Sequence, residues 1–232
     1  MRAGRARGAD LDQPEQFREL CETCVLVTTN NLSLFETLRT VTYARWARLI
    51  AGLWVFGTGV ALMKRAQLGL GPWDVLGDGL SKLTGLQLGT VTIMVGACVL
   101  LLWLFIKERP GIGTVANILL IGLAVNATLA MVPDSDNLVL RVIGLLAGVL
   151  LVGLGSAVYL SARLGAGPRD GLMMGLHRKY GHSIQMTRTS IELIVLAIGW
   201  LLGGTVGIGT LVFAFGIGPV VQFMMKLPGV KR

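Results

Sequence analysis

The chain has 232 residues, of which 53% are hydrophobic and 15% charged, and its mean hydropathy is +0.68. A soluble domain carries about 25% charged residues, so this composition excludes an ordinary soluble enzyme, a collagen, a disulfide scaffold and a coiled coil. Thirteen of the 34 charged residues (21 Lys and Arg, 13 Asp and Glu) lie within the first 48 positions. The remaining 184 residues are apolar enough to form a bundle of membrane-spanning helices.

Residues 1–44 form a polar segment without a sustained apolar period, and they lack the features of a cleavable signal peptide. We expect this segment to be a disordered cytoplasmic tail or the product of a start codon assigned too far upstream. Cys21 and Cys24 form a CxxC pair here, but no second ligand pair accompanies it, so we expect no metal site and no cofactor. Cys98 lies within an apolar run, which favours a small core residue.

Six apolar runs approach the roughly 20 residues needed to cross about 30 Å of hydrocarbon. They cover residues 46–63, 88–106, 111–132, 138–160, 190–202 and 207–225. The fifth run is short and reaches full length only if it includes Arg188 or the glycine pair at 203–204. Two further segments, 68–85 and 164–181, are too short and too polar to span, and each opens with a glycine–proline break. We expect them to be re-entrant or interfacial helices.

An internal repeat with an offset of 96 residues relates the two halves of the membrane part. Residues 57–122 align with residues 153–218 without a gap, with 21 identities in 66 positions. The shared motifs are Leu-Gly-x-Gly-Pro-x-Asp and Gly-Ile-Gly-Thr. Each repeat holds three spans, and an odd number of crossings reverses the direction of the next repeat. We therefore predict an all-α polytopic membrane protein of two inverted three-helix repeats, residues 45–137 and 138–232, each with one short helix.

The basic residues predict an orientation for these spans. With both termini in the cytoplasm, twelve basic residues flanking the spans lie inside and four lie outside, as the positive-inside rule requires. The outer set is Lys64, Arg65, Lys82 and Arg141, with Asp134 and Asp136 on the same side. A rival arrangement of eight crossings with parallel halves requires segment 68–85 to span, and Asp74, Asp78 and Lys82 make that costly.

Two equivalent aspartates are candidates for a binding site. Asp74 and Asp170 each lie two residues after a proline that starts a short helix, where exposed backbone N–H groups favour a carboxylate. One interpretation is that each caps its own helix; the other is a shared site between the halves, where broken helices bind ions. Trp73 aligns with Arg169, so one half offers an aromatic face and the other a fixed cation, which suits an organic anion.

Arg188 and Glu192 lie four residues apart, hence on one helix face, at the start of the fifth span. Ionisable residues inside a span usually face the bundle interior and mark function. These two are either a structural pair or part of a coupling mechanism through Glu192. Their repeat equivalents are Thr92 and Gly96, so the fold itself does not require the pair.

Thr114 and Thr210 close the two Gly-Ile-Gly-Thr motifs, at the starts of the third and sixth spans. Close helix packing is one interpretation of these motifs, and a backbone-lined ion or phosphate site is the other. Asn117 and Asn126 in the third span either hydrogen-bond across helices or line a path, and the hydrogen-bonding interpretation is favoured. The sequence contains no Walker loop, HExxH, GxSxG or kinase motif, so we expect no enzymatic activity.

The sequence resembles the YczE/YitT-like family of bacterial integral membrane proteins and is most similar to its YczE branch. The resemblance rests on residues 68–74, 111–114 and 165–172 and on Arg188 with Ile191 and Glu192, and it covers about residues 45 to 222. It implies a bacterial inner-membrane protein of a family without an established biochemical activity. Members usually start close to the first span, so the residues before about 43 depart from the pattern.

From these features we expect a transporter of a small molecule or ion, with its site between the repeats. The candidate site residues are Trp73, Asp74, Arg169, Asp170, Arg188, Glu192, Thr114 and Thr210. The alternative is a non-transporting membrane protein that assists or regulates a partner protein. The expected surroundings are the lipid bilayer, and a protein partner or a second copy of the chain are further alternatives. Nucleic acid is not expected, because the basic residues flank the spans and form no separate patch.

Overall fold

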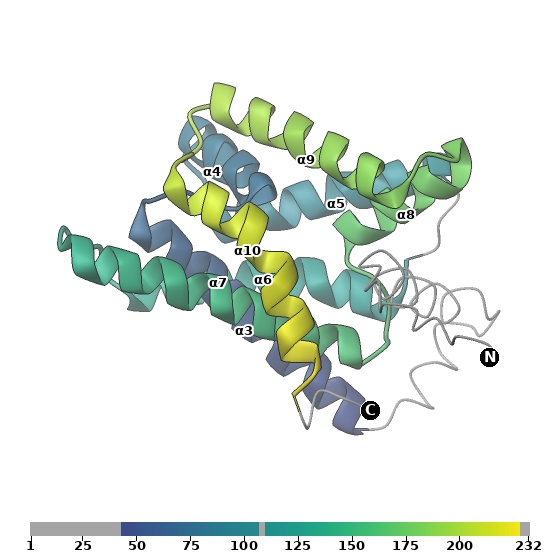
Figure 1. Ribbon diagram of the computed structural model, residues 1–232, viewed down its shortest axis with the longest axis horizontal. Helices are drawn as coiled ribbons and strands as arrows, with labels where there is room; N and C mark the ends of the chain where they lie inside the picture. Colours follow the sequence, from purple (N-terminus) through teal and green to yellow (C-terminus); the bar gives the residue numbers. More distant parts are fainter. Residues whose placement is uncertain (1–42, 107–109, 228–232) are drawn as a thin grey trace, which may run out of the picture.

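The computed structural model describes residues 43–106 and 110–227, and every regular element in this part is an α-helix (Figure 1). The helices are α3 (Tyr43–Ala66), α4 (Pro72–Thr84), α5 (Leu88–Ile106), α6 (Ile112–Met131), α7 (Leu138–Ser161), α8 (Pro168–Tyr180), α9 (Ile184–Leu201) and α10 (Ile208–Met225). The predicted all-α class is confirmed. The CxxC pair at residues 21 and 24 lies outside the described residues.

Six of these helices are long and apolar enough to cross a membrane, namely α3, α5, α6, α7, α9 and α10. They coincide with the six predicted spans, although α3 extends three residues beyond the predicted span at each end and α9 begins earlier than predicted. The fifth span was predicted to begin at residue 190, but α9 begins at Ile184, because the Ser183 side chain accepts a hydrogen bond from the backbone N–H of Met186. Arg188 and Glu192 therefore lie within the helix.

The two remaining helices, α4 and α8, have 13 residues each, and they begin and end in the same way. Each begins with a proline after an extended glycine, as predicted from the glycine–proline breaks. Each ends at a glycine in the left-handed conformation, Gly85 with φ 73° and Gly181 with φ 72°. Thirteen residues span about 20 Å, which is too short to cross the hydrocarbon core.

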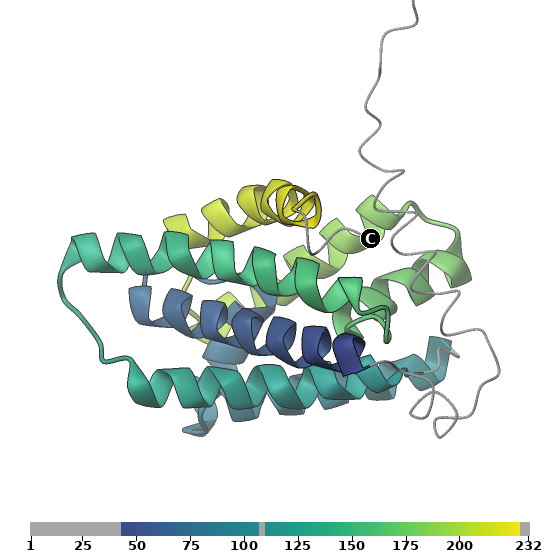
Figure 2. The same ribbon diagram turned by 90° about the horizontal axis from the view of Figure 1, so that it is seen from below.

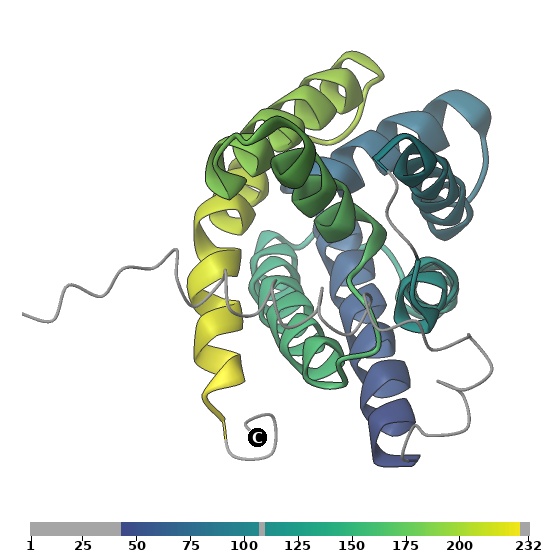
Figure 3. The same ribbon diagram turned by 90° about the vertical axis from the view of Figure 1, so that its right-hand side faces the viewer.

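The eight described helices form two groups of four, one below the other in Figure 1 and viewed from the right-hand side in Figure 3. In the first, here called the α3 group, α3 packs on α6 and α7, and α10 packs on α7. In the second, the α4 group, α4 packs on α5 and α9, and α8 packs on the same two helices. The main contact between the groups joins α5 to α6.

Glycines set the central crossing of the α3 group, where α3 lies between α6 and α7 (Figure 2). Gly52 lies against Gly155, and Gly59 lies against Gly148, so α3 and α7 run antiparallel. A methyl group on any of these four glycines would come within 2.8 Å of a backbone or side-chain atom of the other helix. The absence of side chains thus allows the two backbones to touch, which is typical of membrane helix pairs.

Much of the apolar surface points outward, as expected for a protein surrounded by lipid. Leu104, Phe105 and Phe215 are each more than 70% exposed. Cys98 is also exposed, so its expected place in the core was wrong. An apolar run in a membrane helix does not distinguish the protein interior from the lipid-facing side, because both are apolar.

The central crossing gives a direct test of the fold. In Gly155→Ala, the new methyl group would lie 2.5 Å from the Phe56 nitrogen and 2.6 Å from the Gly52 oxygen, both backbone atoms, so the helices must separate. We expect a loss of about 1–3 kcal/mol, measured as a lower midpoint of thermal unfolding in detergent. Gly216 on α10 has no neighbour within 4 Å, so Gly216→Ala is the control. It should be neutral or gain up to about 1 kcal/mol of helix propensity. Equal effects of the two substitutions would contradict the packing.

Candidate functional site

The starts of α4 and α8 meet, and this contact brings together three of the predicted site residues. The Arg169 Nη2 atom lies 3.3 Å from the Asp74 Oδ1 atom, and the Asp74 residue is only 4% exposed. The guanidinium of Arg169 also lies over the Trp73 ring, 5.2 Å from its centroid. Trp73 and Arg169 are repeat equivalents, so equivalent positions of the two halves face each other here.

The indole of Trp73 is packed among apolar side chains of α5, α8 and α9, in a cluster that includes Trp103 and Val195. Its Nε1 atom is buried and has no hydrogen-bond partner among the described residues. The Nε1–H group of Trp103, by contrast, donates to the Pro168 carbonyl at 3.0 Å. This bond ties α5 to the start of α8. The site thus contains one buried donor that has no hydrogen-bond partner among the described residues.

Asp170 follows Arg169 and points toward a different partner. Its Oδ2 atom accepts a hydrogen bond from the Tyr159 hydroxyl at 3.2 Å. A side chain at Gly167 would lie 3.4 Å from the Asn117 amide nitrogen, so Asn117 of α6 also lies beside the start of α8. Asp74 is therefore paired with the Arg169 cation, whereas Asp170 accepts a hydrogen bond from the Tyr159 hydroxyl.

Reciprocal hydrogen bonds hold the linkers that precede the two short helices. The backbone N–H of Gly209, at the start of α10, donates to the Leu68 carbonyl at 2.7 Å. In the equivalent contact, the N–H of Gly113 at the start of α6 donates to the Leu164 carbonyl at 2.8 Å. Each Gly-Ile-Gly-Thr motif therefore binds the Leu-Gly-x-Gly-Pro linker of the other half, a pairing that the sequence pattern did not reveal.

The linker glycines and the motif threonines fit into the same contact. Gly69 and Gly165 have φ values of 122° and 128°, which side-chain-bearing residues rarely adopt, and both lie against the Gly-Ile-Gly-Thr motif of the other half. Thr114 is fully buried; its hydroxyl accepts from the Gly111 N–H and donates to the Ala166 carbonyl at 2.7 Å. Thr210 is 3% exposed and accepts from the Gly207 N–H.

The last two predicted site residues form a second ion pair, on α9. The Arg188 Nε atom donates to the Glu192 Oε1 atom at 2.9 Å, and both side chains are partly exposed, at 36% and 28%. The next turn of α9 carries Val195, which packs in the cluster around Trp73. The pair therefore lies near the candidate site along α9 and is neutral as a unit.

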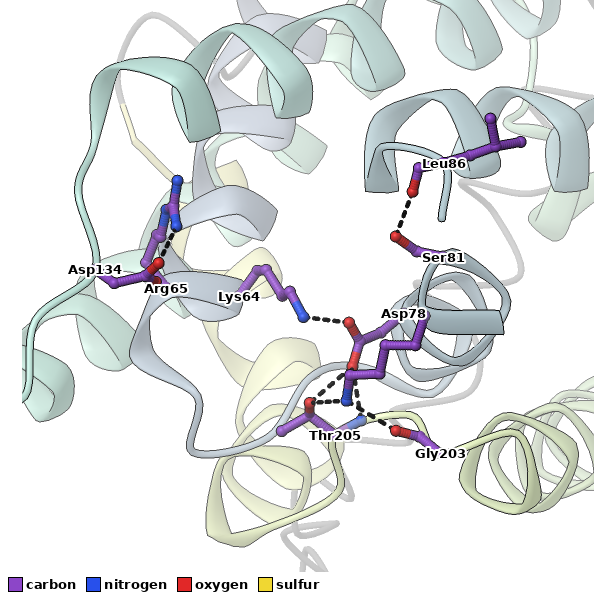
Figure 4. Close-up of polar contacts among 9 residues, drawn as sticks. Lys64, Arg65, Asp78, Ser81, Leu86, Asp134, Gly203 and Thr205 are labelled. Carbon is purple, nitrogen blue, oxygen red and sulfur yellow. Dashed lines mark hydrogen bonds and ion pairs between the residues drawn. The ribbon is translucent and has the colours of Figure 1, made fainter. Parts of the chain in front are cut away.

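A further polar cluster surrounds Asp78, which is completely buried although it was not predicted as a site residue (Figure 4). It forms ion pairs with Lys64 of α3 and with Lys82, at 3.0 Å for the latter. The N–H and hydroxyl of Thr205, in the α9–α10 linker, donate to its Oδ2 atom at 2.8 and 2.7 Å. Lys82 also donates to the Gly203 carbonyl at 2.8 Å.

The environment of Asp78, on a helix that is not one of the six candidate spans, lowers the pKa of its carboxyl group. Burial alone would raise this pKa, but hydrogen bonds from Lys64, Thr205 and Lys82 outweigh the effect of burial. Asp78 is therefore ionised at neutral pH. The sequence did not predict this cluster, because the repeat equivalent of Asp78 is Met174 and the two halves therefore do not share it. Only the four-residue spacing of Asp78 and Lys82 indicated a possible ion pair.

An apolar groove of about 380 Å³ lies between α5 and α6, lined by side chains that include Ile93 and Ile118. Its lining is almost entirely apolar and some of it is exposed. It does not include any of the predicted site residues. Such a groove suits the hydrocarbon of lipid and not a polar solute, so the candidate site is defined by the polar residues at the helix starts.

Comparison with known proteins identifies the family of the chain. Residues 43–226 match the model of a family of unknown function, DUF6198. The chain belongs to this family. It is 36% identical to the uncharacterized membrane protein YczE of Bacillus subtilis over 183 residues, which cover 78% of this chain and 85% of YczE. The predicted resemblance to the YczE branch is thus confirmed.

Two further relatives are similar over most of their length. An uncharacterized protein of Haemophilus influenzae is 40% identical over 191 residues, which cover 82% of this chain and 88% of the relative. The Bacillus subtilis protein YyaS is 26% identical over 164 residues, which cover 69% of this chain and 82% of YyaS. No solved structure matches the chain. With its six apolar helices and its relationship to YczE, the chain is a multi-pass integral membrane protein that contacts the lipid bilayer.

The two motif threonines provide a matched test of the linker contacts. In Thr114→Val, both the Gly111 N–H and the Ala166 carbonyl lose their partner, whereas Thr210→Val removes only the partner of the Gly207 N–H. Each buried group left unpaired costs about 1–3 kcal/mol. We expect Thr114→Val to unfold at a clearly lower temperature in detergent than Thr210→Val. An equal or reversed order would contradict the assigned hydrogen bonds.

Proposed function

We propose that the chain transports a small molecule or ion across the bacterial inner membrane, with its site where α4 and α8 begin. The observation that carries this proposal is the ion pair of buried Asp74 with Arg169, which joins the starts of two short helices from different halves. Broken helices that meet between repeats form the substrate sites of many secondary transporters. Ionisable residues at such positions are costly in an apolar environment and are kept for function.

The proposal includes two inverted repeats, which several contacts support. In an arrangement with a two-fold relation between the halves, each contact is matched by a second one between the equivalent residues. The Gly52–Gly155 contact is matched by the Gly148–Gly59 contact, because Gly148 and Gly155 are the repeat equivalents of Gly52 and Gly59. The linker bonds to α6 and α10 form a matched pair in the same way. The antiparallel course of α3 and α7 is the direction that inversion requires.

Arg169 is the residue on which we expect a solute to bind. Its side chain is 28% exposed, whereas that of Asp74 is 5% exposed, so the guanidinium is the accessible member of the pair. An anionic group of a solute would bind the guanidinium beside the Trp73 ring, in competition with Asp74. Asp170, Thr114 and Thr210 complete the proposed site, and Glu192, with its partner Arg188, is the candidate for coupling transport to a second ion.

The orientation is part of the proposal, with both termini in the cytoplasm. The four basic residues predicted to lie outside share one end of the structure. Lys64 and Lys82 both bind Asp78, Arg65 binds Asp134, and Arg141 donates to the Ala66 carbonyl. Their common position supports the sidedness predicted from the distribution of charge.

Flux through proteoliposomes tests the proposed function. We expect the purified protein to move at least one member of a panel of small organic anions, zwitterions and inorganic ions. Arg169→Gln should reduce this flux by about tenfold or more, corresponding to about 1.4 kcal/mol of lost binding. Arg169→Lys keeps the positive charge beside Asp74 and should retain part of the flux. This variant therefore controls for misfolding that an unpaired Asp74 would cause in Arg169→Gln.

Arg163→Gln is the matched control, because Arg163 is exposed and its repeat equivalent is Gln67, with the same φ of 53°. It should leave the flux unchanged. If the folded wild-type protein moves no solute of the panel, or if Arg163→Gln and Arg169→Gln are equally impaired, the proposed site is wrong. The first result would favour the alternative, a membrane protein that assists or regulates a partner.

A further inference from the structure

The two halves differ in one contact, although their helices correspond. In the first half, α5 packs against α6 from Gly89 to Gly96. In the second half, the equivalent helices α9 and α10 make no extensive contact within the described part of the chain. Figure 1 shows α10 running away from α9 after the short linker that joins them. The difference cannot follow from the topology, which is the same in both halves.

The α5–α6 contact is close and includes polar bonds. A side chain at Gly89 would lie 2.0 Å from the Gly122 carbonyl oxygen, and one at Gly122 would lie 2.4 Å from Ile93. The Gly89 N–H donates to the Asn126 side chain at 2.8 Å, and Asn126 donates to Thr90 at 3.2 Å. The expected bonding of Asn126 across helices is thus confirmed. This contact lies at the Asp78 end of the molecule, where α4 passes into α5.

The equivalent surface of α10 is uncovered. Gly218, the equivalent of Gly122, has no atom within 4 Å of the position that a side chain would occupy. Thr189, the equivalent of Ile93, is also exposed. Ala214, the equivalent of Ile118, is exposed as well. Thr189 lies near the start of α9, toward the end of the molecule opposite the Asp78 cluster, because the other end of α9 leads to Thr205 beside Asp78.

We propose that the α4 group rocks against the α3 group, so that in a second conformation α9 packs on α10 as α5 now packs on α6. In that conformation α5 separates from α6. This inference rests on the proposed function, because the exchange would open the site alternately to the two sides of the membrane. The two halves have the same topology, so the second half can form the contact that corresponds to the α5–α6 contact.

The side chains of the second half are suited to this contact in size. In the first half, a β-branched residue, Ile93, faces Gly122; in the second, β-branched Thr189 would face Gly218. At the neighbouring pair the small and the large residue change helices. In the first half the small residue is Gly96 on α5, where a side chain would lie 3.0 Å from the large Ile118 on α6. In the second half the large residue is Glu192 on α9 and the small one is Ala214 on α10. At these two positions a small residue faces a large one in both halves. At a third position the halves differ, because Gln185 is the equivalent of Gly89, so α9 must pack on α10 at a wider spacing than α5 on α6.

The Asp78 cluster joins the two groups at the end that is now closed. Lys64 belongs to the α3 group, whereas Asp78 and Lys82 belong to the α4 group. At the same end, Arg65 and Asp134 pair within the α3 group and its α6–α7 loop (Figure 4). The Lys64–Asp78 bond must therefore break if the groups separate at this end, while the Arg65–Asp134 pair is unaffected.

Disulfide cross-linking tests the second conformation. In a chain whose three cysteines are replaced by alanine, Thr189→Cys and Gly218→Cys are combined in membranes and oxidised. A disulfide needs the two Cα atoms within about 7 Å, so it reports the α9–α10 contact directly. We expect an intramolecular cross-link, identified on gels and by mass spectrometry of the joined peptide. The control pairs Thr189→Cys with Gly216→Cys, which lies on the opposite face of α10 and also has no neighbour. It should react at least about tenfold more slowly.

The Asp78 cluster provides a second, independent readout. Asp78→Asn weakens the bond between the groups and should raise the rate of Thr189–Gly218 cross-linking by several-fold. Asp134→Asn, which removes an ion pair within one group at the same end, should leave the rate unchanged. Absence of an intramolecular cross-link, a rate equal to that of the Gly216 control, or cross-links only between two copies would overturn the inference.

The cross-link measures a distance and needs no substrate, so it can fail separately from the proposed function. Flux without a Thr189–Gly218 cross-link would leave a transporter that moves in another way. A cross-link in a protein that moves no solute would leave the rocking motion and overturn the transport proposal.

Discussion

Backbone that leaves a helix inside a membrane protein must find hydrogen-bond partners, because neither lipid nor an apolar core supplies them. The chain breaks its helices at the two linkers before α4 and α8, and the partners come from the other half. Gly209 and Gly113 donate to the Leu68 and Leu164 carbonyls, and the glycines at the linkers allow the close approach. These two contacts explain why both short motifs occur twice at a fixed distance in the sequence, and they fix where α4 and α8 begin.

The position of the candidate site follows from the same constraint. Once each linker is bound to the opposite half, the starts of α4 and α8 face each other, and the positions at which the halves differ in sequence come into contact. Arg169 then lies over its equivalent, Trp73, and binds Asp74. The antiparallel glycine contacts of α3 and α7 form the centre of the α3 group. The main contact of the α4 group with it joins α5 to α6.

Much of this arrangement could be predicted from the sequence, because its signals are local. Apolar length identified the six spans, and the glycine–proline breaks identified the starts of α4 and α8. Three features could not be predicted. The Asp78 cluster joins residues up to 141 positions apart, from Lys64 to Thr205, without a repeated motif. The exposure of Cys98 depends on which face of α5 meets lipid. The separation of α9 from α10 is a difference between equivalent helices, and nothing in the repeat pattern indicates it.

The central claim is that the two halves are inverted, and the residues after the two left-handed glycines test it most directly. Leu86 and His182 are repeat equivalents, both are exposed, and each directly follows the end of a short helix. Single cysteines at these positions, Leu86→Cys and His182→Cys, would be exposed to a membrane-impermeant thiol reagent in right-side-out and inside-out vesicles. Inverted halves require the two cysteines to react from opposite faces, with Leu86→Cys labelled from outside and His182→Cys from the cytoplasm. Labelling of both from the same face would show parallel halves and contradict the account.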